Sequence, residues 1–265
     1  MMLKVSNLNF SYKGYKKSKG SHKVFSGFSL EFAKGFNVIL GPNGAGKSTL
    51  IKAIFGLLDY EGEIFYGQES LTAMCTEDKI KLMSYLPQMD VDLSTLTVLE
   101  MVILGRLPEL SHKVSDEDLD IVMDTLRSLN IEHLAPRNFS ELSGGQKKLV
   151  FIAQTLVRNP KVLLLDEPVN SLDLQKQLEL CQLLQRVVAE QNVDLIVVLH
   201  DINLAARYAQ HIVVVDGKGS LYSAGEPREV ITAAMLQEVY GVIANITYDE
   251  QGVPIIAPVC SVRGI

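Results

Sequence analysis

Nine consecutive residues near the start of the chain have the pattern of a phosphate-binding loop. They are Gly41, Pro42, Asn43, Gly44, Ala45, Gly46, Lys47, Ser48 and Thr49, and the first eight fit G-x-x-x-x-G-K-[ST] without a substitution. The glycines allow a sharp turn whose backbone N–H groups converge on an anion, and the following helix adds its positive N-terminal end. Lys47 would reach the β- and γ-phosphates of a nucleotide, and the Ser48 hydroxyl would help to coordinate a magnesium ion. The loop predicts binding of a nucleoside di- or triphosphate.

Polar side chains at the ends of three further apolar runs could complete this chemistry. The run 161–167 predicts a buried strand that ends in Asp166 and Glu167. An aspartate there could hold magnesium through water, and the adjacent glutamate could orient or deprotonate a water molecule. Gln88 follows the predicted strand 83–86 and could reach the same magnesium or water, although it could equally be a plain loop residue. His200 ends the predicted strand 194–199 and is either a structural histidine or a γ-phosphate sensor.

A second predicted anion site and an aromatic residue lie outside the loop. Leu142, Ser143, Gly144, Gly145 and Gln146 open a predicted helix, and a serine with two glycines at a helix start can bind an anion. Tyr12 ends the alternating stretch 3–12. From spacing alone, we favour a role for Tyr12 in covering the sheet over one in stacking on a base.

The elements that must position these residues predict an α/β fold. The apolar run 36–40 is short enough for a buried strand, and 49–58 has helical periodicity, so the loop has the strand and helix that it requires. The stretches 3–12 and 24–32 predict an antiparallel hairpin around an exposed, lysine-rich loop, 13–23. That loop could touch lipid headgroups or a nucleotide, but a solvated loop is the simpler interpretation.

The middle and the end of the chain differ from this alternating core. Predicted helices at 97–105 and 115–129 indicate a helical subdomain, about 93–145, inserted into the core. The tail, about 217–265, predicts a helix at 226–240 and a hairpin formed by 246–248 and 253–257, with a role in packing or dimer contact. The prediction is a single domain, 1–265, with a P-loop core, an N-terminal antiparallel β subdomain and the inserted helices.

Composition narrows the possible partners and compartments. The chain has 265 residues, 47% of them hydrophobic and 21% charged, which suits a compact α/β protein. Its net charge of −6 gives no basic field, so no nucleic-acid partner is expected. Cys75, Cys181 and Cys260 are far apart, which favours free thiols in a reducing compartment. Without a secretory signal or an apolar run of about 20 residues, we expect a cytosolic protein, or one held at a membrane only by a partner.

Together these motifs resemble those of one family. Their order is similar to that in the ATP-binding subunits of ABC transporters. In this chain the order is the phosphate-binding loop, Gln88, Leu142 to Gln146, Val162 to Glu167, Ser171-Leu172-Asp173 and His200. The Leu-Ser-Gly-Gly-Gln signature is decisive because other P-loop classes lack it. The resemblance runs from about Leu3 to Pro258.

The resemblance implies an ATPase that works as a head-to-tail homodimer, with each ATP between the P-loop of one copy and the signature of the other. It implies that Tyr12 stacks on adenine, which reverses the preference above, and that Ser48, Gln88 and Asp166 hold Mg²⁺. It further implies roles for Glu167 as catalytic carboxylate, for Asp173 as cross-dimer contact and for His200 as switch. It also implies a separate permease, a substrate-binding protein reached through that permease, and a place on the inner face of the cell membrane.

A narrower resemblance points to importers of iron-siderophore, haem and cobalamin, with some molybdate relatives. It rests on Gly105-Arg106-Leu107-Pro108, on 200–205 and on the tail from Gly225-Glu226-Pro227 to Val239-Tyr240-Gly241-Val242. Two departures from the family pattern occur: Lys147-Lys148-Leu149 replaces Arg-Gln-Arg, and Val169 stands where threonine is common. The sequence also admits an exporter ATPase, a soluble ABC ATPase in assembly or repair, or a nucleotide switch with little hydrolysis.

Overall fold

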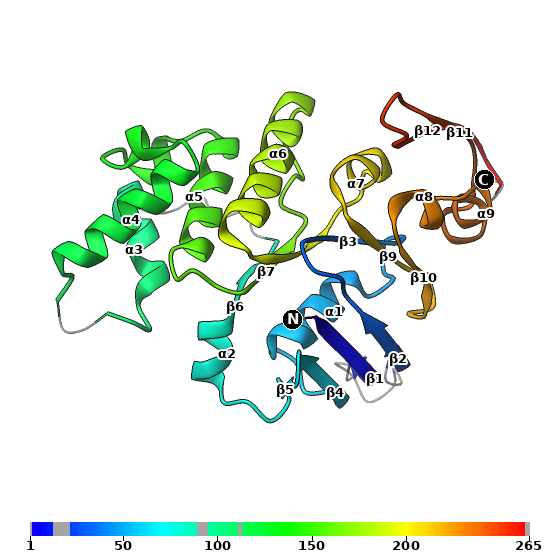
Figure 1. The fold of residues 1–265 in the computed structure, drawn as a ribbon, viewed down its shortest axis with the longest axis horizontal. Helices are drawn as coiled ribbons and strands as arrows, with labels where there is room; N and C mark the ends of the chain where they lie inside the picture. The colour runs from blue at the N-terminus through cyan, green and yellow to red at the C-terminus, as the bar shows by residue number, and fades with distance from the viewer. Residues whose placement is uncertain (1, 13–21, 89–94, 111–112, 263–265) are drawn as a thin grey trace. The chain divides into compact units, whose positions relative to one another are not determined.

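The computed structural model describes residues 2–12, 22–88, 95–110 and 113–262, and the chain is coloured along its length in Figure 1. Its contacts divide it into two compact units, which are described one at a time. The first comprises Met1–Thr76 with Leu195–Ile265, and the second Glu77–Asp194. Of the predicted lysine-rich loop 13–23, only His22 and Lys23 lie within the described residues, and both belong to a strand.

The first unit contains the predicted antiparallel sheet, with strand order β2-β1-β4-β5. Its strands are β1 (Leu3–Tyr12), β2 (His22–Glu31), β4 (Glu61–Tyr66) and β5 (Glu69–Ser70). Leu3, Val5 and Leu8 of β1 are buried, and the pairing with β2 shifts register between Val5 and Leu8. The irregularity includes Asn7, whose φ is +52°. The alternating apolar pattern therefore formed the expected half-buried sheet.

A second group of strands in this unit surrounds β3 (Phe36–Leu40), all five residues of which are buried. Strands β8 (Asp194–Val198) and β9 (His211–Val215) pair with it in parallel, and β10 (Leu221–Gly225) pairs with β9 antiparallel. Helix α1 (Lys47–Phe55) follows β3, and α7 (Ile202–Tyr208) follows β8. Because parallel strands end at the same edge, the connections after β3 and β8 lie at one edge of the sheet.

The tail differs from its prediction. In place of one helix at 226–240, the chain forms α8 (Pro227–Val230), α9 (Ala233–Met235) and a π-helical turn, η4 (Leu236–Tyr240). The helix breaks because Thr232 is extended and its hydroxyl accepts a hydrogen bond from the Met235 N–H, 3.1 Å away, which starts a new turn. The final hairpin, β11 (Val242–Tyr248) with β12 (Pro254–Ser261), is longer than predicted.

The second unit is mostly helical. Its elements are α2 (Thr76–Leu82), β6 (Met83–Leu86), α3 (Val98–Ile103), η1 (Leu104–Arg106), α4 (Asp116–Ser128), η2 (Glu132–Leu134), η3 (Phe139–Glu141), α5 (Gly144–Leu156), β7 (Val162–Asp166) and α6 (Leu174–Gln191). Helices α3, α4 and α5 pack on one another around buried Val102, Val122 and Val150. Strands β6 and β7 are parallel, with Leu86 opposite Leu165. Among the described residues, no helix is both long and apolar enough to cross a membrane.

The Gly-Arg-x-Pro segment joins three of these helices. A Cβ on Gly105 would lie 2.2 Å from the carbonyl oxygen of Gln154 in α5, so only glycine fits. Arg106 donates to Asp118 of α4 at 3.0 and 2.9 Å and pairs with Glu109 at 3.1 Å. Hydrogen bonds from Ser115 and the nearby Arg106 hold the pKa of the Asp118 carboxyl below its usual value. This segment therefore holds the helical part of the unit together.

Candidate functional site

The phosphate-binding loop has the backbone that its glycines predict. Gly41, Gly44 and Gly46 have φ values of +152°, +80° and +94°. A Cβ on Gly41 would lie 2.3 Å from the Val215 carbonyl oxygen, and one on Gly46 would lie 2.8 Å from the side chains of Val24 and Phe25. The fold itself thus requires these two glycines.

Lys47 is folded back over the loop. Its side chain is buried, and Nζ donates to the carbonyl oxygens of Gly41 at 2.8 Å and Pro42 at 3.0 Å. Ser48 is half-buried and Thr49 buried, while Asn43 and Gly44 are exposed. Two of the partners of the ammonium group are thus neutral carbonyl oxygens of its own loop, and an anionic phosphate attracts an ammonium group more strongly than such carbonyls do.

Tyr12 lies beside the start of α1. Its hydroxyl is 3.2 Å from the Thr49 hydroxyl, and its ring packs edge-on against Phe10 with 4.8 Å between ring centres. The side chain is 42% exposed, so it does not serve as a buried cover for the sheet. An exposed ring next to the loop is suited to stack on a planar group.

His200 lies at the sheet edge where the loop begins. Strand β8 pairs with β3, with Ile39 opposite Val198, and the Leu199 N–H donates to the Ile39 carbonyl oxygen at 3.4 Å. His200 is exposed, and the next residue, Asp201, caps α7. Tyr240 of η4 also contacts the loop, with its hydroxyl against the Gly41 backbone but without a hydrogen bond of standard geometry to any described residue. Burial raises the pKa of Tyr240 to about 12.

In the second unit, Gln88, Asp166 and Glu167 line one cavity of about 70 Å³. They meet because β6 and β7 are parallel and end at the same edge. Asp166 is buried at the end of β7, whereas the backbone of Glu167 is left-handed, with a φ of +56°, and turns out of the strand. The structure thus brings a carboxamide and two carboxylates to one cavity, and the contacts with Mg²⁺ and water that the sequence suggests for them stay a prediction.

Two residues of this cavity were not predicted. The Asn170 side-chain amide donates to Glu167 Oε2, and Lys148 Nζ donates to the Asn170 carbonyl oxygen. Asn170 follows Glu167 by three residues, a spacing that could have drawn attention to it. Lys148 belongs to the segment that departs from the family pattern and is 22 residues from Asn170, so no pattern in the sequence indicates its role.

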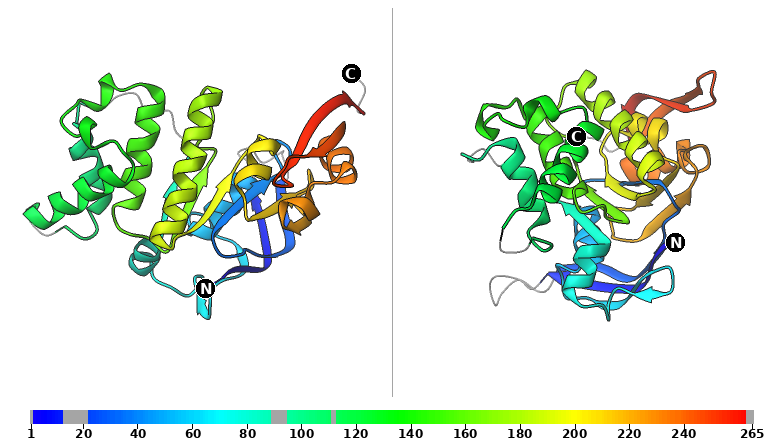
Figure 2. Two further views of the ribbon diagram at one scale, coloured as in Figure 1. Left: turned by 45° about the horizontal axis from the view of Figure 1, so that its top comes forward. Right: turned by 60° about the vertical axis from the view of Figure 1, so that its left-hand side comes forward.

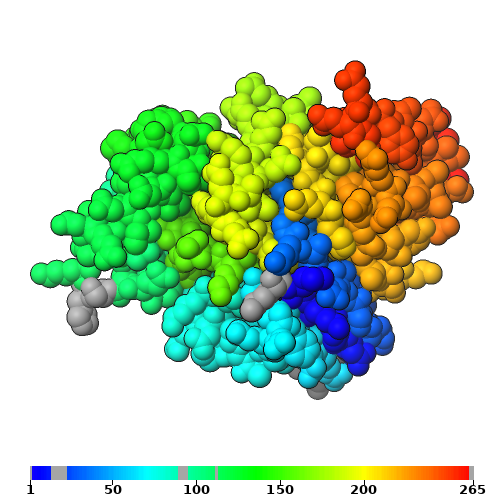
Figure 3. Space-filling model, in the orientation of Figure 1, coloured from blue at the N-terminus to red at the C-terminus, as the bar shows by residue number. Residues whose placement is uncertain are grey.

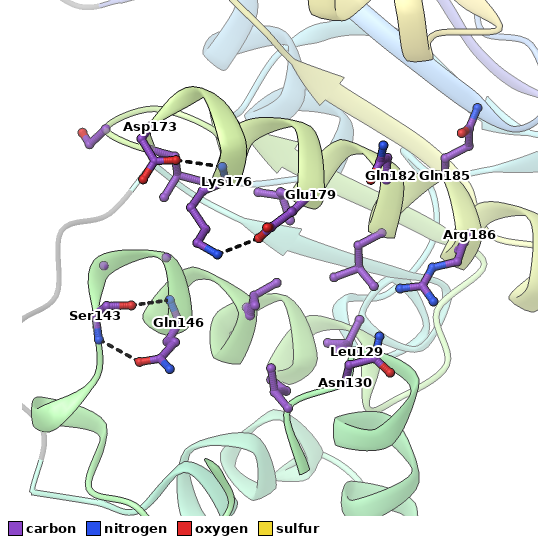
Figure 4. Close-up of a pocket in the computed structure, with 18 residues that line it drawn as sticks. Leu129, Asn130, Ser143, Gln146, Asp173, Lys176, Glu179, Gln182, Gln185 and Arg186 are labelled. Atoms are coloured by element: carbon purple, nitrogen blue, oxygen red, sulfur yellow. Dashed lines mark hydrogen bonds and ion pairs between the residues drawn. The ribbon is translucent and has the colours of Figure 1, made fainter. Parts of the chain in front are cut away.

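The signature residues open α5 with a capping box. Ser143 Oγ accepts from the Gln146 N–H at 3.3 Å, and Gln146 Oε1 accepts from the Ser143 N–H at 3.0 Å (Figure 4). A Cβ on Gly144 would meet no atom of the described residues within 4 Å, and one on Gly145 would make an ordinary 3.6 Å contact with Leu172. Unlike Gly41 and Gly46, these glycines are not required by packing within the chain.

The signature faces a groove of about 920 Å³ between α5 and α6 (Figure 4). Asp173 caps α6 by accepting from the Lys176 N–H at 2.9 Å, and Lys176 Nζ pairs with Glu179 at 2.7 Å. Ser143, Gly144, Gly145, Gln146 and Asp173 all line this groove. The predicted signature contacts and the predicted cross-dimer aspartate therefore share one surface.

The predicted magnesium ligands are chemically suited to that ion. Ser48, Gln88 and Asp166 offer hydroxyl, carboxamide and carboxylate oxygens, and Mg²⁺ prefers oxygen ligands, several of them from water and phosphate. Among the described residues, no group of three or more His, Cys, Asp or Glu could hold a metal ion.

The strand, glycine turn and helix around Lys47 define a P-loop nucleotide-binding fold. The family model described as ABC transporter matches residues 25–170. An uncharacterized ABC transporter ATP-binding protein of Methanocaldococcus jannaschii, MJ0089, is 38% identical over 98% of both chains. The chain belongs to the ATP-binding proteins of ABC transporters, which are ATPases.

Two further likenesses are more specific. The iron(3+)-hydroxamate import ATP-binding protein FhuC of Bacillus subtilis is 36% identical over 87% of both chains. A metal-chelate type ABC transporter solved in an inward-facing conformation matches with a TM-score of 0.81 and 27% identity over 97% of both chains. The α/β ABC ATPase fold predicted from the sequence is thereby confirmed.

Proposed function

We propose that this chain powers the import of a metal chelate, such as an iron-siderophore, haem or cobalamin, through a separate membrane permease. The likeness to an iron(3+)-hydroxamate import protein over 87% of both chains is the observation that carries this proposal. The Gly-Arg-x-Pro segment and the tail motif agree with it. A metal oxyanion is a second substrate class for the same group of importers.

The first unit binds the nucleotide. Adenine stacks on the exposed ring of Tyr12, and the N–H groups of the loop surround the phosphates. The Lys47 ammonium leaves the Gly41 and Pro42 carbonyls for the β- and γ-phosphates, to which it is attracted more strongly. Ser48, Gln88 and Asp166 would hold Mg²⁺, which neutralises part of the phosphate charge.

Glu167 acts on the attacking water. Its carboxylate accepts a proton as the water oxygen bonds to the γ-phosphorus, and the bond to the β–γ bridging oxygen breaks to leave ADP and inorganic phosphate. The Asn170 amide holds one carboxylate oxygen, so the other is oriented toward the water. Lys47 and His200 stabilise the charge that develops on the γ-phosphoryl oxygens.

A second copy of the chain completes each site. Gly144 and Gly145 have room for a side chain within the chain, so we infer that close approach of another molecule requires them to be glycine. In a head-to-tail dimer, Ser143, the Gly144 and Gly145 amides, Gln146 and Asp173 of one copy face the γ-phosphate bound by the other. Closure therefore depends on ATP, and loss of the γ-phosphate reopens the dimer. A permease contacting the chain would sense this motion.

Affinity capture tests the transporter proposal. Tagged Glu167→Gln protein is incubated with its native membranes in ATP and magnesium, and Lys47→Ala protein serves as the control that cannot retain nucleotide. We expect a polytopic permease to co-purify with the first and much less with the second. Recovery of soluble assembly or repair proteins alone would refute the importer.

The direction of transport and the transported substrate are tested in cells in which this protein carries Glu167→Gln. An importer should lose uptake of a radioactive ferric hydroxamate, haem or cobalamin supplied outside, whereas cells with an inactivated exporter should accumulate their substrate. A steady-state ATPase assay of the wild-type chain separates both from a nucleotide switch that hardly hydrolyses ATP.

A further inference from the structure

The C-terminal hairpin is bonded to the helix that follows His200. The Asn203 side chain donates from Nδ2 to the Ile256 carbonyl oxygen at 3.1 Å and accepts at Oδ1 from the Ile256 N–H at 2.8 Å. A carboxamide is suited to this because it is donor and acceptor at once. Strand β12 accordingly lies beside α7 (Figure 2), and the hairpin, in red, is visible at the surface in Figure 3.

Asn203 is also connected to His200 along the chain. The Asn203 N–H donates to Asp201 Oδ1 at 2.8 Å, and the Leu204 N–H donates to the same oxygen at 3.0 Å. Asp201 is the cap of α7, and His200 directly precedes it. The first turn of α7 is thus fixed from inside by Asp201 and from outside by the Ile256 backbone.

This outer attachment matters because α7 is short. Seven residues are too few for a helix that is stable on its own, so packing must hold it in place. A second contact with the hairpin lies at the far end of α7, where Arg207 pairs with Asp249 at 2.7 Å. The two contacts differ in their distance along the chain from His200, three residues against seven.

We propose that Asn203 is a positioning residue for His200, through which the hairpin β11–β12 sets the rate of ATP hydrolysis. The inference rests on the role proposed above for His200. The sequence of the tail contains no motif with chemistry of its own, and the tail instead holds the first turn of α7 so that His200 stays in reach of the γ-phosphate. The motif at 200–205 and the tail are distant in the sequence, and in the folded chain they together position His200.

Steady-state ATPase kinetics of five variants test this assignment: Asn203→Ala, Asn203→Gln, His200→Ala, the double variant Asn203→Ala/His200→Ala, and Arg207→Ala. We expect Asn203→Ala to lower kcat about 10-fold, because a small misplacement of a reacting group is costly, with little change in the KM for ATP. Arg207→Ala should turn over like the wild type. The double variant should be no slower than His200→Ala, because Asn203 acts through that histidine. Asn203→Gln, which keeps both hydrogen-bonding groups, should recover part of the lost rate.

Each of the following outcomes overturns the inference, and each shows separately whether the proposed role of His200 stands. Wild-type turnover by Asn203→Ala beside an inactive His200→Ala refutes positioning but keeps the role of His200. Equal losses in Asn203→Ala and Arg207→Ala indicate mere attachment of the tail. Losses that multiply in the double variant show that Asn203 acts without His200. Normal turnover by His200→Ala removes that residue from the mechanism.

Thermal unfolding of every variant shows whether a lower kcat results from loss of the folded structure. If Asn203→Ala fails to fold, Asn203→Asp replaces it, because aspartate keeps the acceptor for the Ile256 N–H.

Discussion

Glu167 is held in an uncommon conformation by its neighbours. A left-handed backbone costs a residue other than glycine on the order of 1–3 kcal/mol, so the surrounding structure must impose it. The hydrogen bond from the Asn170 amide to Glu167 Oε2 is part of that surrounding structure, and Lys148 in α5 holds Asn170 in turn. The proposed catalytic carboxylate is therefore fixed from both its backbone and its side chain.

Removal of the Asn170 amide should impair turnover more than folding. We expect Asn170→Ala to lower kcat about 10-fold because the Glu167 carboxylate becomes free to rotate. Asn138→Ala is a matched control, since Asn138 donates to Glu141 at 2.8 Å in an exposed pair away from the cavity. Unchanged kcat in Asn170→Ala, measured under saturating ATP, would contradict the assignment.

His211 should make stability depend on pH. Its Nδ1 is buried without a partner among the described residues, and burial lowers the pKa of the imidazole below 6.5. Below that pH the unfolded chain binds a proton that the folded chain resists, so stability falls as pH falls through this range. Thermal unfolding between pH 8 and pH 5 should show the decline, and it should be smaller in His211→Gln. The control variant His133→Gln changes an exposed histidine, and its loss of stability between pH 8 and pH 5 should equal that of the wild type.

At the scale of elements, the structure explains why Gly-Arg-x-Pro occurs where the helices meet. Arg106 is only 11% exposed and contacts α4, while Gly105 permits the close approach of α5. A buried ion pair contributes little when intact, yet loss of one partner leaves the other uncompensated. The segment therefore specifies how the helices pack.

Arg106→Ala should destabilise the second unit. We expect its melting temperature to fall by roughly 5 °C, because Asp118 and Glu109 lose their shared partner. Arg127→Ala removes an i,i+3 pair whose side chains are 61% and 72% exposed, and it should change the melting temperature very little. Equal shifts in the two variants, measured by calorimetry, would show that Arg106 is only a surface charge.

At the scale of the whole molecule, some glycines are needed for the chain to fold and others for its assembly with a second copy. Gly46 is required by contacts within the chain, whereas Gly144 faces open space in the groove beside α6. Substitution at Gly46 should therefore destabilise the folded monomer, whereas substitution at Gly144 should weaken only the binding of a partner at that surface.

ATP-dependent dimerisation tests this distinction. Light scattering should show Glu167→Gln as a dimer with ATP and magnesium, because hydrolysis no longer reopens it, and as a monomer without nucleotide. Adding Gly144→Ala should weaken the dimer at least 10-fold while the melting temperature stays the same or rises, since alanine is the better helix former. A double variant that dimerises as tightly as its parent would exclude this glycine from the interface.

The sequence by itself determined the parts of this protein that depend on neighbours along the chain. The turn around Lys47, the capping boxes at Ser115 and Ser143, and the cap at Asp173 use hydrogen bonds that span three residues or fewer, or backbone angles that only glycine readily adopts. Strand periodicity indicated the ends where Asp166 and His200 lie. Such features follow from local composition, and so they were predictable.

Only the tertiary structure decided the contacts between distant segments. Asn203 and Ile256 are 53 residues apart, and Lys148 and Asn170 are 22 apart, so no spacing rule connects them. The break at Thr232 likewise overrode a helical pattern, because a side-chain cap and the packing of the tail outweighed propensity. These contacts depend on where the chain returns in space, which is set by burial of the whole core rather than by any short stretch.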